Sequence, residues 1–262
     1  SALERVTDGL PLFLGYLIED LTAAFDAMAK MPERVAKIRS LPAPFSSYLR
    51  EAVTELRRTP DAGWTRGVSF LFAILARAQG PITEREIEGV FACWRAIDAA
   101  AGECPNLLGL HHRVARWISM RRLGEEWAFT LAHPAIAKAF SVAFPEDADF
   151  AEEVLVRWAQ EAWRAHPGPR GAKRRPGYAL RWLPHNLASM GDKVALRDLL
   201  TNWEFLAERV SEPDDAPDLL AATLREWIGF SLGVGHDDAW SRYWDQNSNM
   251  LEWIVGRGAG GV

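Results

Sequence analysis

The segment from about residue 64 to residue 145 constrains the fold most, because its hydrophobic periodicity changes partway along. SFLFAILARAQ (Ser69–Gln79) and ITEREIEGVFACW (Ile82–Trp94) carry apolar residues at helical spacing and are separated by Gly80-Pro81. Thr83 and Glu86 have the spacing of a capping box, which predicts the start of the second helix. Its inward face is predicted to be Ile87, Val90, Phe91 and Trp94.

Two strand-like runs follow, ARWISMRR (Ala115–Arg122) and EWAFTLA (Glu126–Ala132). They are separated by LGE, in which Gly124 suits a positive φ. With a third helix expected over Asn106–Arg113, three helices precede a β-hairpin, which is the order of a winged helix. The helix after His133 is expected to pack behind the hairpin through Ile136, Ala139 and Phe140.

The flanking segments have helical patterns. A helix near residues 45–58 is expected to bury Phe45, Leu49, Val53 and Leu56. From Asp149 onward, one face is formed by Ala151, Val154, Leu155, Trp158, Ala162 and Trp163. After a Pro- and Gly-rich linker (His166–Gly177), a helix is expected to end at Gly191, and Thr201 with Glu204 predicts a second capping box. The predicted fold is mainly α: a helical domain at 1–60, a winged helix with one β-hairpin at 61–146 and a C-terminal helical domain at 147–262.

Composition excludes several classes of protein. A net charge of -5 argues against a dedicated nucleic-acid-binding protein. Cys93 and Cys104 are too few for a disulfide framework and suit a reducing compartment. Neither a membrane-length apolar run nor a signal peptide is visible, so we expect a cytoplasmic protein. The chain opens without Met and is amphipathic at once, so we expect a piece of a longer polypeptide.

Four segments resemble the signal-transduction ATPases with numerous domains, the superfamily of the NB-ARC and apoptosome proteins. TDGLPLFLGYLIEDL (7–21) resembles the helix after the ATPase core, and ILARAQGPITEREIEGVF (74–91) resembles part of the winged helix. WAFTLAHPAIAKAF (127–140) falls where that domain carries a Met-His-Asp signature. YALRWLPHNLASMGDKVALRDLLTNWEFLAERV (178–210) is similar to a helical linker of bacterial members, and is the most specific of the four.

The resemblance implies a regulatory segment that lies after an ATPase core, closes over ADP and swings away with ATP. In the family, a Gly-x-Pro proline lies against the base and the signature histidine contacts the β-phosphate. Carried over, these residues are Gly9, Pro11 and His133. ADP or ATP with Mg would belong to the parent protein and no cofactor to the isolated chain. The implied partners are the ATPase core and the repeat or effector domains of the same polypeptide, with oligomerisation of the activated parent, and neither nucleic acid nor membrane.

The sequence departs from the family at two points. Leu-Ala-His-Pro stands in place of Met-His-Asp, so only His133 carries over. Nothing matches G-x-x-x-x-G-K-[ST], since Gly63–Gly67 has the wrong spacing and no lysine. Without that loop the chain lacks a phosphate nest, and we expect no catalysis by the isolated chain.

Two interpretations of the candidate nucleotide contacts stay open. His133 is either a phosphate donor or a junction histidine satisfied by the local backbone. Pro11 is either a base contact or an ordinary first-turn proline. If the chain is a switch, Pro60–Gly63 and Pro167–Gly177 are the candidate hinges.

Other chemistry-bearing residues give weaker patterns. The cysteines and His111-His112 lack the close pairs of a structural zinc site, so we expect no metal. The run His236-Asp237-Asp238 is better explained by a helix N-cap at one of the aspartates than by catalysis. Neither H-E-x-x-H nor G-x-S-x-G occurs.

The alternative functions are a winged-helix transcription regulator with a helical effector or dimerisation domain, and a plain helical protein-interaction module. Basic residues near the hairpin favour DNA binding, and another basic run follows in the linker: Arg113, Arg116, Arg121, Arg122, Lys173, Arg174 and Arg175. Acidic residues of the candidate recognition helix oppose it, because Glu84, Glu86 and Glu88 would repel phosphates.

Overall fold

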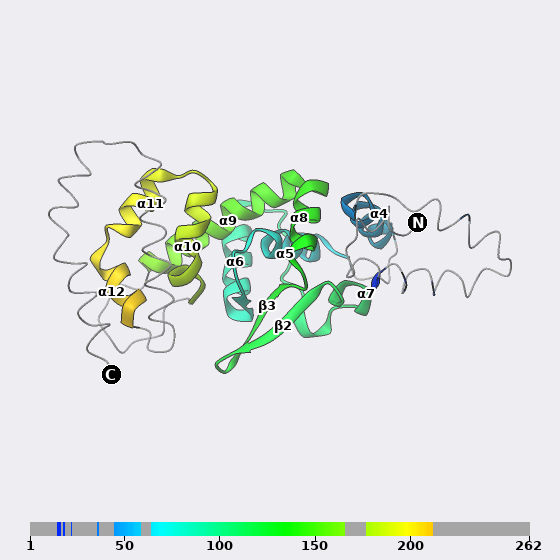
Figure 1. The fold of residues 1–262 in the computed structure, drawn as a ribbon, viewed down its shortest axis with the longest axis horizontal. Coiled ribbons are helices and arrows are strands. Elements are labelled where there is room, and N and C mark those ends of the chain that lie inside the picture. Colours follow the sequence, from blue (N-terminus) through cyan, green and yellow to red (C-terminus); the bar gives the residue numbers. More distant parts are fainter. Residues whose placement is uncertain are drawn as a thin grey trace. The chain divides into compact units, whose positions relative to one another are not determined.

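The chain is mainly helical with a small antiparallel sheet, as expected (Figure 1). A computed structural model describes residues 15, 16, 18, 22, 36, 45–58, 64–165 and 177–211. Contacts divide the chain into two compact units, Ser1–Leu155 and Val156–Val262. The three-part division with boundaries after residues 60 and 146 stays a prediction.

Helix α4 (Phe45–Arg58) buries the predicted stripe, with Phe45, Leu49, Val53 and Leu56 at most 6% exposed. It packs against α8 (Pro134–Ala143), and Arg50 Nη2 donates to the carbonyl oxygen of Ala143 at 3.3 Å. The apolar spacing therefore places α4 against the helix that carries His133 at its N-terminus.

Helix α5 (Arg66–Arg77) begins at Thr65, whose hydroxyl accepts from the Val68 N–H at 3.2 Å. After the Gly-Pro turn, α6 (Glu84–Ile97) begins with the predicted capping box. The Thr83 N–H donates to Glu86 Oε2 at 2.9 Å, and the Glu86 N–H donates to the Thr83 hydroxyl at 3.3 Å. The predicted inward face is confirmed, because Ile87, Val90, Phe91 and Trp94 are buried.

The sheet has three strands in the order β1-β3-β2, whereas the sequence predicts a hairpin alone. The hairpin is present as β2 (Ile118–Leu123) and β3 (Glu126–Leu131), and Gly124 has the expected positive φ of 61°. The additional strand, β1 (Ile82–Thr83), pairs antiparallel with β3. It is formed by the two residues before α6, so it ties the start of that helix to the hairpin.

The predicted third helix over Asn106–Arg113 is wrong in its bounds. The chain forms a short 3-10 helix, η2 (Leu107–Gly109), and then α7 (His112–Ala115). The Asn106 side chain accepts from the Gly109 N–H at 3.1 Å. Leu110 has an extended backbone (φ −60°, ψ 138°), so the first turn ends at Gly109 and a separate helix begins at His112.

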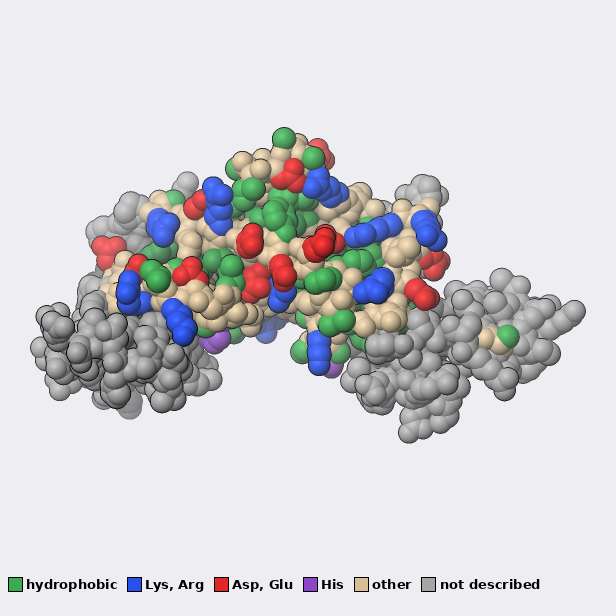
Figure 2. Space-filling view, turned by 90° about the horizontal axis from the view of Figure 1, so that it is seen from above, with side chains coloured by type: hydrophobic (Ala, Val, Ile, Leu, Met, Phe, Trp, Pro, Cys, Tyr) green, Lys and Arg blue, Asp and Glu red, His purple; other side chains and the backbone are tan. Residues whose placement is uncertain are grey.

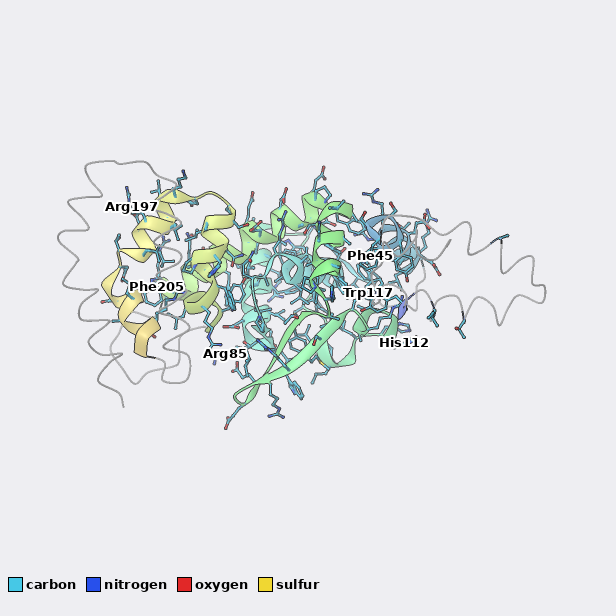
Figure 3. The ribbon with its side chains drawn as sticks, in the orientation of Figure 1. Phe45, Arg85, His112, Trp117, Arg197 and Phe205 are labelled. Carbon is cyan, nitrogen blue, oxygen red and sulfur yellow. The ribbon has the colours of Figure 1, made fainter. Side chains whose placement is uncertain are left out.

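Aromatic rings from the hairpin and the helices meet in the core of the first unit. Trp117, which lies just before β2 and is labelled in Figure 3, is 1% exposed. Its ring meets Phe72 of α5 edge-on, with centroids 5.7 Å apart, and Phe72 lies 6.1 Å from Phe140 of α8. The α8 face predicted to pack inward, Ile136, Ala139 and Phe140, is buried. These contacts hold the hairpin base and α8 together.

Helix α9 (Pro145–Arg164) begins four residues before the predicted start at Asp149, with a proline at its first position. Its first turns are held by arginines of other helices. Arg57 lies 3.6 Å from Asp147, and Arg77 pairs with Asp149 and with Glu152, the latter at 3.5 Å. The unit boundary falls inside this helix.

The second unit is built from the end of α9 and from α10 (Gly177–Ser189), α11 (Lys193–Leu200) and α12 (Trp203–Ser211). Trp163 meets Phe205 edge-on at 5.0 Å between centroids. Pro184 lies inside α10 and lacks the N–H of a regular helix. The fully buried Arg209 reaches that helix, with Nη2 3.5 Å from the carbonyl oxygen of Arg181.

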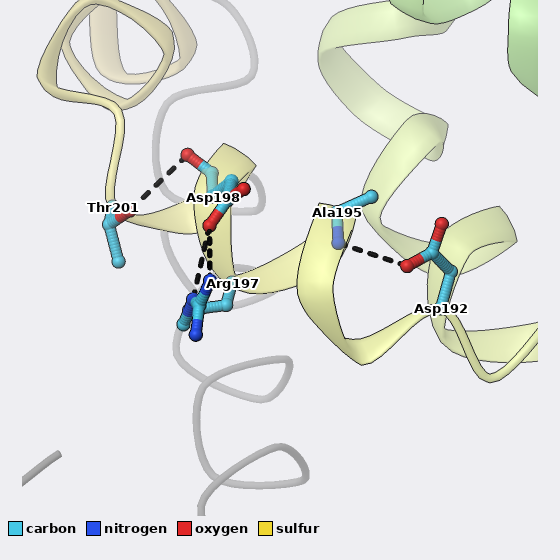
Figure 4. Close-up of polar contacts among 5 residues, drawn as sticks. All are labelled: Asp192, Ala195, Arg197, Asp198 and Thr201. Carbon is cyan, nitrogen blue, oxygen red and sulfur yellow. Dashed lines mark hydrogen bonds and ion pairs between the residues drawn. The ribbon is translucent and has the colours of Figure 1, made fainter. Parts of the chain in front are cut away.

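The predicted capping box at Thr201 and Glu204 is wrong. The N-cap interaction of α12 comes from Asn202, whose Oδ1 accepts from the Phe205 N–H at 3.1 Å. Thr201 instead ends α11, where its hydroxyl donates to the carbonyl oxygen of Asp198 at 3.3 Å (Figure 4). Gly191 has a φ of 71° after α10, as a helix-ending glycine requires.

Some predictions fall outside the described residues. The linker at 166–176 and the predicted helices after residue 211 are among them. Among the helices that the structure describes, none has both the length and the apolar composition of a membrane span.

Candidate functional site

His133 lies where β3 gives way to α8. Strand β3 ends at Leu131, and His133 is the N-cap of α8, with an extended backbone (φ −154°, ψ 144°). Pro134 occupies the first helical position, which suits its fixed φ. The Ala132 N–H donates to the carbonyl oxygen of Trp117 at 2.8 Å, so the junction is fastened to the base of β2.

The side chain of His133 caps its own helix. Nδ1 accepts from the Ala135 N–H at 3.0 Å. A ring nitrogen that accepts carries no hydrogen, so this contact selects the neutral tautomer with hydrogen on Nε2. His133 is half-buried, and among the described residues Nε2 has no hydrogen-bond partner. The ring is thus oriented by the backbone and retains one N–H donor.

The N-terminus of α8 itself has few donors left for a ligand. Pro134 has no N–H, the Ala135 N–H is bound to the His133 ring, and the Ile136 N–H donates to the carbonyl oxygen of His133 at 3.0 Å. The junction therefore offers an anion one imidazole N–H and the positive end of the helix dipole. This suits a single contact to a phosphate oxygen and does not form a cradle for one.

Helix α6 carries mixed charge on its exposed side. Arg85, labelled in Figure 3, Glu88 and Arg95 are exposed. Glu86 is buried and its carboxylate accepts from the Thr83 N–H in the capping box. The prediction that Glu86 would repel DNA phosphates is therefore wrong. On the face seen in Figure 2, acidic and basic side chains are interspersed among apolar ones. That face presents no broad field of one sign.

The basic residues near the hairpin divide into two groups. The Arg116 guanidinium lies over the rings of Trp117 and Tyr16, at 5.3 and 5.4 Å from their centroids. Arg121 and Arg122 are exposed on β2, and Arg122 lies 4.9 Å from the ring centroid of Trp127. The exposed positive charge of the hairpin therefore comes from two adjacent residues of β2.

The cysteines and paired histidines are not gathered into one site. Cys93 is buried in α6, and burial raises the pKa of the half-buried Cys104 thiol to about 11, with Glu88 adding to the shift. The rings of His111 and His112 lie 4.2 Å apart. Over the described ranges, His, Cys, Asp and Glu side chains do not come together in groups of three that fit a metal ion.

The other predicted site residues lie outside the described residues. Gly9 and Pro11 are among these, as are the run at 236–238 and the hinge candidates, apart from Gly177 at the start of α10. Of the three residues predicted to contact a nucleotide, His133 alone is therefore among the residues that the structure describes.

Comparison with family models, with curated proteins and with solved structures finds no match to this chain.

Proposed function

We propose that the chain is the regulatory segment of a signalling ATPase of the NB-ARC type, in which it acts as a nucleotide-dependent switch and as the linker to downstream domains. One observation supports this above the others: at the end of β3, Nδ1 of His133 accepts from the Ala135 N–H, which leaves Nε2 as the nitrogen able to donate. A neutral imidazole held in this way donates one hydrogen bond to a phosphate oxygen.

The chain contributes a contact to the nucleotide and no chemistry. When bound, ADP or ATP with Mg would be held by the P-loop of the parent protein, because this sequence has none. His133 then senses whether the phosphate is within reach, while Gly9 and Pro11 are proposed to approach the base. We expect no ATPase activity from the isolated chain. Turnover that persists through repeated purification would contradict this.

The test separates the two roles of His133 in the full-length polypeptide. His133→Ala removes the cap and the donor, whereas His133→Ser restores an N-cap oxygen and still lacks an imidazole N–H. Phosphate contact predicts that ADP which co-purifies with the protein falls by a similar factor in both variants. If the Ser variant retains wild-type ADP and only the Ala variant loses it together with stability, His133 acts only as a cap and the proposal is wrong.

The proposed setting is the cytoplasm, with the ATPase core and the repeat or effector domains of the same polypeptide as partners. Their contacts with this chain would differ between the ADP and ATP states, as a two-position switch requires. Assembly of the activated parent into oligomers belongs to the same proposal. It is tested by comparing the mass of the full-length protein with ADP and with a non-hydrolysable ATP analogue.

DNA binding is the second candidate, and the exposed Arg121 and Arg122 of the hairpin favour it. Glu88 on the exposed side of α6 opposes it, because phosphates would lie beside a carboxylate. Salt-dependent retardation of duplex DNA by this chain would support the alternative. A helical interaction module, the third candidate, is supported by capture of a partner from outside this polypeptide.

A further inference from the structure

The outer edge of β2 presents backbone groups with which no described strand pairs. The strand order β1-β3-β2 places β2 at one side of the sheet, and Figure 1 shows the β2–β3 hairpin extending beyond the helices of its unit. Ser119, Met120, Arg121 and Arg122 are exposed. Within the part of the chain that the structure describes, β2 pairs with β3 alone.

The hairpin register identifies which backbone groups face outward. Trp117 accepts a hydrogen bond from the Ala132 N–H, and these residues continue the register that pairs Ile118 with Leu131. Because hydrogen-bonded and non-bonded pairs alternate along an antiparallel ladder, Ser119 and Arg121 bond to β3. The N–H and C=O groups of the residues between them point away from β3. These residues are Ile118, Met120 and Arg122.

The side chains along this edge set the chemistry of a strand that would pair with it. Arg121 and Arg122 place two positive charges on opposite faces of the strand, and neither forms an ion pair in the described structure. Met120, between the bonded positions, is 50% exposed. A complementary strand therefore has carboxylates beside the two arginines and an apolar residue beside Met120.

A second copy of the chain matches this edge poorly. Antiparallel self-pairing about Met120 would bring the Arg121 residues of the two copies to diagonal positions. Two further guanidinium groups, from Arg122, would lie along the same short ladder. Charged residues on an edge strand discourage pairing of like edges, and the same charges attract an acidic strand.

We infer that the β2 edge of the hairpin binds an acidic, extended segment of another protein by strand addition. Main-chain hydrogen bonds to Ile118, Met120 and Arg122 would supply the pairing, and the two arginines would select for carboxylates. This inference does not rest on the proposed nucleotide switch, since it uses neither His133 nor an ATPase core.

The test is an NMR titration of the ¹⁵N-labelled chain with a peptide that contains Thr-Glu-Glu-Val-Thr-Val, flanked by uncharged residues. Strand addition predicts slowed exchange of the Met120 and Arg122 amide hydrogens. The Ser119 and Arg121 amides, already bonded to β3, should change little. A matched peptide with Lys in place of both Glu residues should not bind. Equal protection at all four positions, or equal binding of the Lys peptide, would overturn the inference.

Variants of Met120 test the backbone directly. Met120→Pro removes an outward N–H and leaves the bonds to β3 intact, so the acidic peptide should no longer bind. Met120→Val keeps that N–H and should retain binding. Arg121→Gln and Arg122→Gln should each weaken binding by roughly twofold to fivefold. If the acidic peptide binds the Pro variant as tightly as the wild-type chain, charge attraction alone explains the binding, and strand addition is contradicted.

Peptide variants keep the test decisive if the Pro substitution disturbs folding. N-methylation of peptide amides that face β2 should abolish binding, while N-methylation of the alternate amides should not. Equal effects of the two methylation patterns would refute strand pairing. Sedimentation equilibrium tests a second copy as the occupant: a dimer of the free chain, with the same amides protected without peptide, would assign the edge to that copy and overturn the proposal.

Discussion

Replacing Gly67 by Ala should destabilise the first unit, because the added methyl group meets a neighbouring loop. A Cβ at Gly67 would overlap the carbonyl oxygen of Glu103 and lie 3.2 Å from that residue's carbonyl carbon. The loop has little freedom to withdraw. Gly102 approaches so closely that its own Cβ would lie 2.6 Å from Gly67 N, and the Arg66 guanidinium is 2.6 Å from Asp98.

Two effects of opposite sign decide the magnitude. Ala is favoured over Gly in a helix by up to about 1 kcal/mol. Overpacking against immobile atoms costs about 1–3 kcal/mol, and here the obstructing atoms are backbone. Displacing the loop also disturbs the Arg66–Asp98 ion pair. The destabilisation by overpacking is therefore larger than the stabilisation from the higher helix propensity of Ala. We expect a net loss of about 2 kcal/mol, which corresponds to a fall in Tm of roughly 4–8 °C.

Urea unfolding followed by tryptophan fluorescence measures this loss. Gly124→Asn is the matched control, since a Cβ at Gly124 would have no atom within 4 Å and Asn tolerates the φ of 61° there. It should change stability by less than about 1 kcal/mol. If Gly67→Ala is as stable as the wild-type chain, the close packing inferred between α5 and the loop is wrong.

Three further predictions concern titratable groups and a helix cap. Alkylation of Cys104 by iodoacetamide should keep accelerating up to about pH 11, because burial raises the pKa of its thiol; a plateau near 9.0, its ordinary value, would contradict this. A hydrogen bond from the Ala100 N–H lowers the pKa of Asp98 below 3.8, so its stabilisation is present above that pH and is lost as pH falls through the lower folded-state value. Asp98→Asn should therefore cost stability at neutral pH, and the deficit in urea unfolding should shrink as the pH falls below 3.8; a deficit that stays constant would refute this. Asn202→Ala should destabilise the second unit by about 1 kcal/mol, while Thr201→Ala should cost less than about 0.5 kcal/mol; the reverse order would restore Thr201 as the cap.

Local patterns predicted the elements that depend on local interactions. The apolar spacing of α4, the capping box at Thr83 and the positive φ at Gly124 follow from residues near in sequence, and all are confirmed. Strand β1 escaped prediction because two residues have no period, and its pairing partner Phe129 is far away in sequence. The sequence feature that could have indicated this strand is the pair of adjacent β-branched residues, Ile82 and Thr83.

The cap of α12 was predicted wrongly, because spacing alone favoured Thr201 with Glu204. In the structure Thr201 ends α11, and Asn202 accepts from the Phe205 N–H. The position of His133 between strand and helix was predicted. A contact of its side chain with the local backbone was one of the two interpretations that the sequence left open, and the structure shows one, from the Ala135 N–H to Nδ1. The outer edge of β2 was also missed, since it follows from strand order.

The most direct test of the central proposal is the ¹⁵N resonance of His133 Nε2 in the full-length polypeptide, recorded with ADP bound and after ADP is removed. Phosphate contact predicts that the Nε2 signal shifts when ADP leaves, while Nδ1 remains hydrogen-bonded to the Ala135 N–H. An Nε2 signal that is the same with and without ADP would show that His133 caps α8 and senses no nucleotide.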